Sequence, residues 1–270
     1  MSLPAPSAMS TAVVTGASSG IGEALARELA SRGHGVTLVA RRAEKLRALA
    51  DDLREQHQVR AEALACDLSD RAARAKLLDD VLALGLTPEI LINNAGLSTL
   101  GPVAKADPQA EMNMIEVDVV AVADLTTRFL PGMVDRKRGA ILNVASTAAF
   151  QPLPGQAGYG AGKTFVLSYT HSLSGELRGT GVTVAALCPG PVDTGFGEKA
   201  GFDKDDAEAA LPKFIWETPE AVAKCGIDAL ARGKVVAIPG FANRAGAVFA
   251  QHTPRRLLVP MLASRHPGLK

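Results

Sequence analysis

The chain has 270 residues, of which 47% are hydrophobic, 21% are charged and 4% are aromatic, and its formal net charge is +1. This composition is typical of a globular protein that buries a sizeable core. The small net charge and the few aromatic residues argue against nucleic-acid binding and against a strong overall attraction to an anionic membrane.

The start of the chain and its cysteines say little about chemistry. Residues 1–10 lack the positive charge and apolar core of a signal peptide, and we expect them to form a disordered tail. No apolar run is long enough to span a membrane, so we expect a cytoplasmic protein. Cys66, Cys188 and Cys225 are odd in number and show no metal or redox spacing, so we expect small buried residues in a reducing compartment.

Seven short apolar runs alternate with helical patterns along the rest of the chain. The runs lie at 11–15, 35–40, 59–67, 89–96, 139–146, 182–190 and 234–240. The helical patterns lie at 23–33, at a stretch that contains Leu46, Leu49 and Leu53, and at 69–84, 107–134, 157–179 and 218–231. Because the apolar runs are nearly continuous rather than alternating, they predict a parallel sheet with helices on both faces. Residues 11–270 contain no linker or repeat, which indicates a single α/β domain.

Two segments of the second half fall outside this alternation. Residues 190–217 form the longest irregular segment, and loops of that length are often lids over a ligand. Residues 241–270 mix apolar and basic residues and are expected to form a helix that packs on a partner or a substrate. A membrane-surface role is the weaker alternative because Pro254 and Pro260 interrupt the segment.

A glycine-rich turn follows the first apolar run. Gly16, Gly20 and Gly22 stand between a predicted strand and a predicted helix. Glycine at these positions lets the backbone approach a pyrophosphate, and the N-terminus of the next helix favours anions. A plain tight turn is the alternative, but the strand and helix on either side favour a dinucleotide site.

The end of the second run indicates which dinucleotide would bind. An acidic residue there would bind the ribose hydroxyl of NAD, but the sequence has Ala40, Arg41 and Arg42. Arg41 offers a planar fork to a 2′-phosphate, and no carboxylate is present to repel one. The alternative is a solvated pair at a helix start. NADP is favoured.

Polar and small residues also close three later runs. Asp67 is placed to accept from an adenine amino group, and Asn93 to Gly96 would let a cofactor lie against the backbone. Ser146 closes the fifth run, thirteen residues before Tyr159. Each could be an ordinary cap or turn residue. However, ligands of an open parallel sheet bind at this carboxyl edge, which favours a shared site.

With these motifs in place, the chain resembles the short-chain dehydrogenase/reductase family over nearly its whole length, in its NADP-preferring single-domain branch. The motifs are TGASSGIG (15–22), NNAG (93–96), Ser146, YGAGK (159–163) and PGPVDT (189–194). The resemblance implies a Rossmann-type, doubly wound, seven-stranded parallel sheet in a three-layer α/β/α arrangement. It also implies a nicotinamide cofactor and the interconversion of a carbonyl and a secondary alcohol.

The resemblance implies roles for particular residues. Tyr159 would be the general acid/base, Lys163 would lower its pKa and hold the nicotinamide ribose, and Ser146 would bond the substrate oxygen. Val192 or Thr194 would touch the carboxamide. The full set expected to bind NADP(H) is Gly16, Ser18, Ser19, Gly20, Ile21, Gly22, Arg41, Arg42, Asp67, Leu68, Asn94, Ala95, Gly96, Tyr159, Lys163, Pro189, Gly190, Val192 and Thr194.

One position departs from the family pattern. Relatives have an asparagine where this chain has Asp118, and the backbone carbonyl of that residue holds a water behind the lysine. In one alternative, the proton relay behind the lysine needs only that carbonyl, which any residue supplies. Otherwise, the Asp118 carboxylate lies near Lys163 and opposes deprotonation of Tyr159. We favour the second alternative and count Asp118 as a candidate catalytic residue.

The substrate is the least defined part of the prediction. The expected lining is mostly apolar, which suggests an uncharged or partly hydrophobic carbonyl or alcohol; it comprises Ser146, Ala148, Phe150, Pro152, Leu153, Tyr159, Pro191 and the loop 195–216. A 3-oxoacyl carrier-protein reductase is an alternative, although such relatives follow NNAG with an Ile-Thr-Arg-Asp-like stretch where this chain has LSTLG. A non-catalytic dinucleotide sensor is another, and the intact Ser146, Tyr159 and Lys163 oppose it. A sugar-nucleotide epimerase is disfavoured by its different glycine spacing.

The family also implies a homodimer or homotetramer, in which the helices at 107–134 and 157–179 pack against their copies. Apolar residues on these helices fit such an interface, namely Val117, Val120, Val122, Phe165 and Val166. The alternative is that they only face the sheet.

Overall fold

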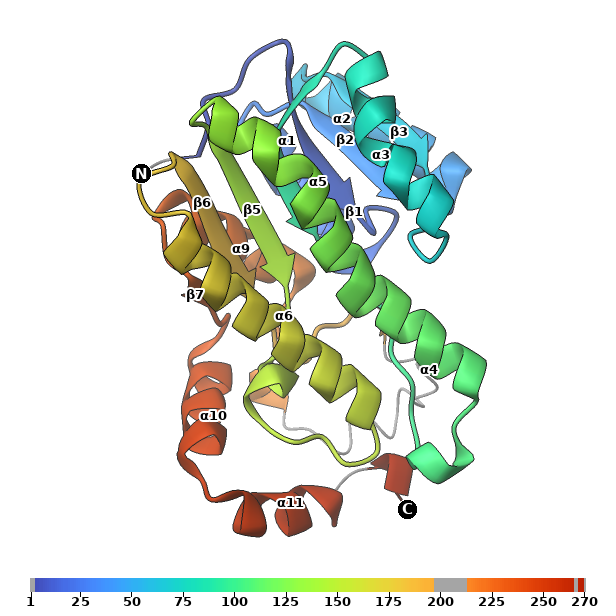
Figure 1. Ribbon diagram of the computed structural model, residues 1–270, viewed down its shortest axis with the longest axis vertical. Coiled ribbons are helices and arrows are strands. Elements are labelled where there is room, and N and C mark those ends of the chain that lie inside the picture. The colour runs from blue at the N-terminus through green and yellow to red at the C-terminus, as the bar shows by residue number, and fades with distance from the viewer. Residues whose placement is uncertain (1–2, 197–212, 265–266, 270) are drawn as a thin grey trace.

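The computed structural model describes residues 3–196, 213–264 and 267–269. These residues form one seven-stranded sheet, whose strands are all parallel and lie in the order β3-β2-β1-β4-β5-β6-β7 (Figure 1). The strands are β1 (Ser10–Thr15), β2 (Val36–Ala40), β3 (Ala61–Ala65), β4 (Thr87–Asn93), β5 (Gly139–Val144), β6 (Val182–Leu187) and β7 (Val236–Ala237). The predicted Rossmann-type fold is confirmed.

Helices cover both faces of the sheet, and each face has its own apolar core. One core joins the sheet to α1 (Gly20–Ser31), α2 (Ala43–His57) and α9 (Pro219–Ala231). The other joins it to α3 (Arg71–Ala83), α5 (Ala121–Asp135) and α6 (Ala157–Glu176). Burial on both faces explains why the strands are continuously apolar: β1, β5 and β6 are buried at every position.

The strand order reverses direction at β1 and β4. From β1 the chain winds outward through β2 to β3, and then returns to place β4 on the other side of β1. Loops at the carboxyl ends of β1 and β4 therefore diverge to opposite faces and leave a crevice between them, which is where such sheets bind ligands. The glycine-rich turn and NNAG follow these two strands.

The predicted helix at 107–134 is not continuous. It comprises α4 (Pro108–Ile115), a π-helical turn (Glu116–Val120) and α5. Asp107 caps the start of α4 by accepting from the backbone N–H of Gln109. A π turn inserts one extra residue into the helical repeat, and such insertions occur frequently at functional sites. Here the turn contains Asp118.

Several 3₁₀ turns complete the described chain: η1 (Val103–Lys105), η3 (Thr147–Phe150), η4 (Lys213–Ile215) and η5 (Pro267–Leu269). The C-terminal segment forms two helices rather than one, α10 (Phe241–His252) and α11 (Arg255–Ala263). Figure 1 shows them at the lower end of the molecule. Strand β7 is shorter than its apolar run because Pro239 has no N–H to continue the ladder.

Several described residues of the segment 1–10, predicted from the sequence to be a disordered tail, make defined contacts. Ser10 already belongs to β1, and its backbone N–H and side chain are bonded to Ser7. Pro4 is buried, and the carbonyl of Ala5 accepts a hydrogen bond from Arg138. These contacts tie the segment to the body of the protein. Most of the predicted lid, residues 197–212, lies outside the described residues.

Among the described residues, none of the helices combines the length and the apolar character needed to cross a membrane.

Candidate active site

The glycine turn has the geometry that the sequence predicts. Gly16 and Gly20 adopt φ values of 68° and 60°, which side chains other than glycine rarely tolerate. A Cβ on Gly22 would collide with the carbonyl oxygen of Gly16, and one on Gly20 would come within 2.9 Å of Thr194 Cβ. The turn is therefore closely packed, and α1 begins within it at Gly20, so the first N–H groups of that helix are available to an anion.

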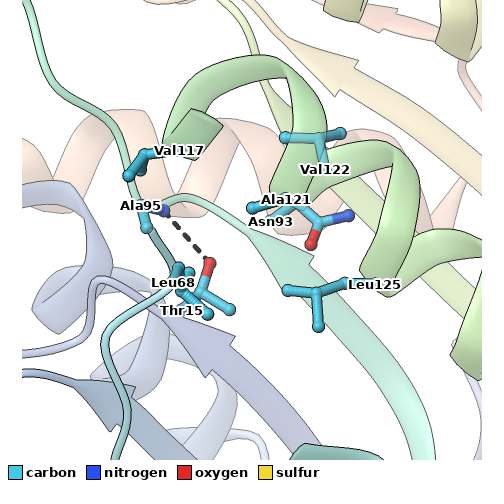
Figure 2. Close-up of a pocket in the computed structure, with 8 residues that line it drawn as sticks. All are labelled: Thr15, Leu68, Asn93, Ala95, Val117, Ala121, Val122 and Leu125. Atoms are coloured by element: carbon cyan, nitrogen blue, oxygen red, sulfur yellow. Dashed lines mark hydrogen bonds between the residues drawn. The ribbon is translucent and has the colours of Figure 1, made fainter. Parts of the chain in front are cut away.

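Thr15 and Asn94 fasten the ends of β1 and β4 together. The Thr15 hydroxyl accepts from the backbone N–H groups of Asn94 and Ala95, at 2.9 and 3.1 Å, and donates to the carbonyl of Ile92. The Asn94 side chain donates to the Thr15 carbonyl at 2.8 Å. Figure 2 shows the Thr15 and Ala95 contact. Asn94 thus fixes the floor of the crevice through its side chain.

Figure 2 also shows a small pocket behind this floor, lined by Thr15, Leu68, Asn93, Ala95, Val117, Ala121, Val122 and Leu125. It has no room for a water-sized molecule, so it is a packing gap and not a ligand site. Asn93 is part of the scaffold as well: its amide donates to Thr126 and Asn143, in a buried chain that joins β4, α5 and β5. Its side chain is 2% exposed.

The two arginines after β2 have different surroundings. Arg42 donates to the hydroxyls of Ser18 and Ser19, both at 2.8 Å, and so closes over the glycine turn. Arg41 is exposed, and its charge helps lower the pKa of Asp67. Burial alone would raise the pKa of Asp67, but hydrogen bonds from Ser69 outweigh that effect. The residues predicted to hold an adenosine 2′-phosphate and an adenine therefore meet at one edge of the sheet.

Ser146 follows β5 and begins the 3₁₀ turn η3. Its hydroxyl accepts from the backbone N–H of Ala148 at 3.1 Å and approaches the carbonyl of Pro189 at 3.5 Å. It also makes a hydrogen bond with Tyr159. Ser146 and Tyr159, the predicted substrate-oxygen donors, therefore lie near each other.

Tyr159 and Lys163 lie one turn apart on α6, as their spacing predicts. Lys163 Nζ lies 5.6 Å from the centroid of the Tyr159 ring and donates to the Val144 carbonyl at 3.2 Å. Tyr159 is half-buried, whereas Lys163 is 4% exposed. The tyrosine is therefore more accessible to solvent than the lysine.

The Asp118 carboxylate lies against Lys163. Asp118 Oδ2 is 2.9 Å from Lys163 Nζ, and Asp118 Oδ1 accepts from the backbone N–H of Leu97 at 2.7 Å. The two side chains are 2% and 5% exposed, so this is a buried ion pair. A Cβ on Gly96 would come within 3.3 Å of both charged groups, so glycine there leaves them room. The π turn brings Asp118 into this position.

The pKa of Tyr159 is raised overall, with Lys163 and Asp118 acting on it in opposite directions. Burial is the largest cause, and the Asp118 carboxylate adds to it, while Lys163 and the hydrogen bond from Ser146 oppose it. Burial also raises the pKa of Asp118, against the pull of Lys163. Lys163 responds differently: burial lowers its pKa, but Asp118 and Tyr159 together outweigh burial, so that its pKa is raised. The lysine stays charged, and Asp118 offsets a smaller part of its effect on the pKa of Tyr159.

The PGPVDT segment returns the chain to the glycine turn. Thr194 packs on Gly20, and Val192 forms a parallel β-bridge with Glu217. A Cβ on Gly190 would collide with the Asn243 side chain, which itself donates to the Ile215 carbonyl at 2.9 Å. Pro189 and Gly190 thus lie between the sheet and α10.

The predicted substrate-lining residues surround the Ser146–Tyr159 pair unequally. Ala148 is 6% exposed and belongs largely to the core, whereas Phe150, Leu153 and Pro191 are half-buried. Within the predicted lid, the ring of Phe196 lies 6.1 Å from that of Tyr159. These residues stay predictions as substrate contacts.

A group of polar residues close to Tyr159 in the chain or bonded to the LSTLG stretch was not singled out from the sequence. Gln156 donates to the Ser98 hydroxyl at 2.7 Å, and Thr99 donates to a Glu111 carboxylate oxygen. The other oxygen of Glu111 lies where a Cβ on Gly158, the neighbour of Tyr159, would stand. The LSTLG stretch that follows NNAG was the available signal, since it leaves the same sheet edge.

The cysteines take no part in this site. Cys66 and Cys188 are buried and Cys225 is half-buried, and all are free thiols. Burial raises the pKa of Cys66 to about 11 and that of Cys188 to about 12, so both remain thiols at neutral pH. The described residues contain no group of histidine, cysteine and acidic side chains that could hold a metal ion.

A Rossmann-type sheet with a glycine turn after β1 and a serine, a tyrosine and a lysine at its carboxyl edge defines a nicotinamide-dependent oxidoreductase. The short chain dehydrogenase family model matches residues 10–205. This chain therefore belongs to the short-chain dehydrogenase family, whose members act on hydroxyl and oxo groups.

Individual relatives agree with this assignment. The chain is 36% identical over 215 residues to the NADP-dependent 3-hydroxy acid dehydrogenase YdfG of Salmonella typhi, covering 76% of this chain and 85% of that protein. It is 39% identical over 189 residues to a short chain dehydrogenase of Pseudocercospora fijiensis, covering 69% of this chain but only 61% of that relative. Among solved structures, a short-chain dehydrogenase from Sphingobium yanoikuyae in complex with NADPH is similar with a TM-score of 0.79 and 34% identity, covering 88% and 91% of the two chains.

Proposed function

We propose that this protein interconverts a carbonyl and a secondary alcohol with NADP(H), using Tyr159 as the general acid/base. The observation that carries the proposal is the assembly of Ser146, Tyr159 and Lys163 at the carboxyl edge of the sheet. Ser146 bonds Tyr159, and Lys163 lies 5.6 Å from the tyrosine ring. A binding protein without turnover would have no use for a paired hydroxyl donor backed by a buried lysine.

The residues at the crevice fit a dinucleotide. The turn from Gly16 to Gly22 has no side chain where a pyrophosphate would approach, and the N-terminus of α1 faces the same place. Arg41 and Arg42 are exposed beside it, and no carboxylate stands at the end of β2. NADP(H) is supported over NAD(H) by that charge, and both YdfG and the Sphingobium protein are described with the phosphorylated cofactor.

The chain's own residues supply proton transfer and charge stabilisation, and the bound nicotinamide would supply or accept the hydride. As a carbonyl is reduced, negative charge grows on its oxygen, and the Ser146 and Tyr159 hydroxyls are placed to donate to it. Tyr159 then gives up its proton, and the positive charge of Lys163 stabilises the phenolate that remains. Asp118 reduces that stabilisation, so at neutral pH the protonated phenol, the form needed for reduction, is favoured.

The substrate we infer is an uncharged or partly hydrophobic carbonyl compound or alcohol. Half-buried Phe150, Leu153 and Pro191 support an apolar wall. The LSTLG stretch, with Ser98, Thr99 and Glu111, offers polar groups that could bind a hydroxyl of the substrate. A 3-oxoacyl carrier-protein reductase remains the second candidate, and YdfG, which acts on 3-hydroxy acids by its name, favours substrates of related shape.

Replacement of Tyr159 by phenylalanine tests the mechanism, because the ring and its packing stay while the proton is lost. Turnover with a panel of ketones should fall by about 10²- to 10⁴-fold, the usual size of a general-acid contribution, while NADPH binding measured by fluorescence persists. A variant that keeps more than about a tenth of the rate would contradict the assigned role. A wild-type protein that binds NADPH but reduces none of the ketones would favour the alternative of a non-catalytic dinucleotide sensor.

We further propose a cytoplasmic homodimer or homotetramer, with residues 11–270 as one catalytic domain and the 190–217 segment as its lid. The structure changes the expected interface: Val117, Val122 and Val166 are buried inside the chain, so the alternative that they pack within the fold holds for them. Phe165 remains exposed and stacks on Tyr169 at 5.5 Å, which keeps α6 a candidate interface.

A further inference from the structure

The helix α10 presents its large apolar side chains to solvent and its small ones to the protein. Asn243, Ala247 and Ala250 form the buried face. Phe241 and Phe249, on the opposite side, are 85% and 59% exposed, and Val248, next to Phe241 in projection, is 52% exposed. Their spacing of seven and eight residues places all three on one face of the helix. A helix that served only to cover its own core would have the reverse arrangement.

The next helix, α11, repeats the pattern. Leu258 is buried, whereas Leu257 is 61% exposed and Met261, one turn later on the same face, is 39% exposed. Pro260 lies beside Leu257 in projection and is also exposed. We call six exposed apolar residues of the two helices the C-terminal apolar surface; they are Phe241, Val248, Phe249, Leu257, Pro260 and Met261. Val259 is 37% exposed but lies on the other side of α11 and is not part of this surface.

The segment that carries this surface is basic throughout. Residues 241–270 contain no aspartate or glutamate, and their basic residues are Arg244, Arg255, Arg256, Arg265 and Lys270. Arg244 and Arg256 are exposed on the flanks of α10 and α11. The whole chain has a net charge of only +1, so the rest of the protein is slightly acidic and the positive charge is concentrated in this segment.

Large apolar side chains bordered by arginine, with no acidic residue, suit an interface with anionic lipid. The apolar groups enter the boundary between headgroups and acyl chains, and the arginines bind phosphate. A second copy of the same surface fits poorly, because symmetric contact would place basic segments against each other without a compensating carboxylate.

The surface also adjoins the proposed active site. Arg255, at the start of α11, donates to the carbonyl of Phe150 in η3, and α10 packs on η3 as well. Further along, η5 packs on Leu100 of the LSTLG stretch, since a Cβ on Gly268 would come within 2.5 Å of Leu100. The described parts of the C-terminal segment therefore contact both η3 and the LSTLG stretch.

We propose that the C-terminal apolar surface docks the protein onto the surface of an anionic phospholipid bilayer, lying in the interface without spanning it. Such docking would bring the substrate opening next to the bilayer, from which a partly hydrophobic carbonyl compound can enter.

Sedimentation of the full-length protein with vesicles tests the proposal. Binding should be stronger to phosphatidylcholine vesicles that contain phosphatidylglycerol than to phosphatidylcholine alone. It should weaken when salt rises from roughly 0.1 M to 1 M, because the Debye length falls from about 10 Å to about 3 Å. Phe249→Ser should weaken the partition by roughly tenfold to a hundredfold, the loss expected for one buried apolar side chain.

A matched control separates docking from general apolar exposure. Leu82 on α3 is 49% exposed and lies outside the C-terminal apolar surface, so Leu82→Ser should leave vesicle binding unchanged. Arg256→Glu should reduce binding to anionic vesicles only. Neither Phe249 nor Arg256 belongs to the catalytic machinery, so both variants should reduce a water-soluble ketone as the wild type does, which distinguishes this proposal from the proposed function.

Two results would overturn the inference. The first is equal sedimentation of Phe249→Ser and the wild type with anionic vesicles, or the absence of wild-type sedimentation. The second is a decrease in oligomer size on Phe249→Ser, measured by light scattering without lipid, which would assign the surface to a second copy of the chain.

Discussion

The buried pair of Asp118 and Lys163 makes a specific prediction about pH dependence. Asp118→Asn keeps the size of the side chain and removes its negative charge. Asp118 Oδ2 is 2.9 Å from Lys163 Nζ, which is 5.6 Å from the Tyr159 ring centroid, so the carboxylate lies no farther than about 8.5 Å from that centroid. At an effective dielectric constant of about 20, two unit charges at that distance interact by about 2 kcal/mol.

The direction follows from the sign of each charge. The Asp118 carboxylate raises the pKa of Tyr159, so its removal leaves Lys163 to stabilise the phenolate and lowers that pKa. Alcohol oxidation needs the phenolate, and its rate should therefore reach the plateau at a lower pH. Carbonyl reduction needs the phenol, so its rate should fall off at a lower pH. An interaction of about 2 kcal/mol corresponds to a displacement of about 1.5 pH units.

The assay is the pH dependence of kcat for both directions with saturating NADP(H). Asp124→Asn is the matched control, since Asp124 lies in α5, pairs with Arg74 and Arg128, and does not contact Lys163. Urea unfolding of each variant establishes that the fold persists. An unchanged profile for Asp118→Asn would refute the electrostatic reasoning and leave only the backbone carbonyl of residue 118 in the relay. If the wild type is inactive and Asp118→Asn makes it active, the alternative of a non-catalytic dinucleotide sensor is favoured.

Three further predictions concern the cofactor, the scaffold and the assembly. Arg41→Ala should raise KM for NADPH by about 10- to 150-fold, the value of one charge-assisted contact, and leave KM for NADH nearly unchanged; more efficient use of NADH by the wild type would reject the NADP assignment. Arg74 is 2% exposed and pairs with Glu116 and Asp124, so Arg74→Leu should lower the free energy of unfolding in urea by about 3 kcal/mol. Arg71→Leu removes an exposed partner of Glu116 and should change that free energy little. Equal losses for the two variants would show that burial does not decide the effect. Light scattering at micromolar concentration should give a multiple of 28.0 kDa, and a monomer mass would exclude the proposed dimer and tetramer.

Local sequence patterns were enough to predict the strands, the glycine turn and the Tyr159–Lys163 pair. Continuous apolar runs can only be buried on both faces, which requires a parallel sheet covered by helices. Once that sheet is accepted, the carboxyl ends of its strands meet at one edge, and the residues that follow them are brought together. A spacing of four residues within a helix likewise places Tyr159 and Lys163 on one face.

Tertiary structure alone decided the environment of those residues. Asp118 reaches Lys163 because a π turn interrupts the helix, and hydrophobic periodicity carries no sign of one extra residue. The raised pKa of Tyr159 results from burial and from the sum of two opposite charges, whose distances depend on how α4, α5 and α6 pack. The same limit applies to the exposed face of α10: its sequence shows an amphipathic helix, but only packing determines that the small side chains, and not the phenylalanines, face the protein.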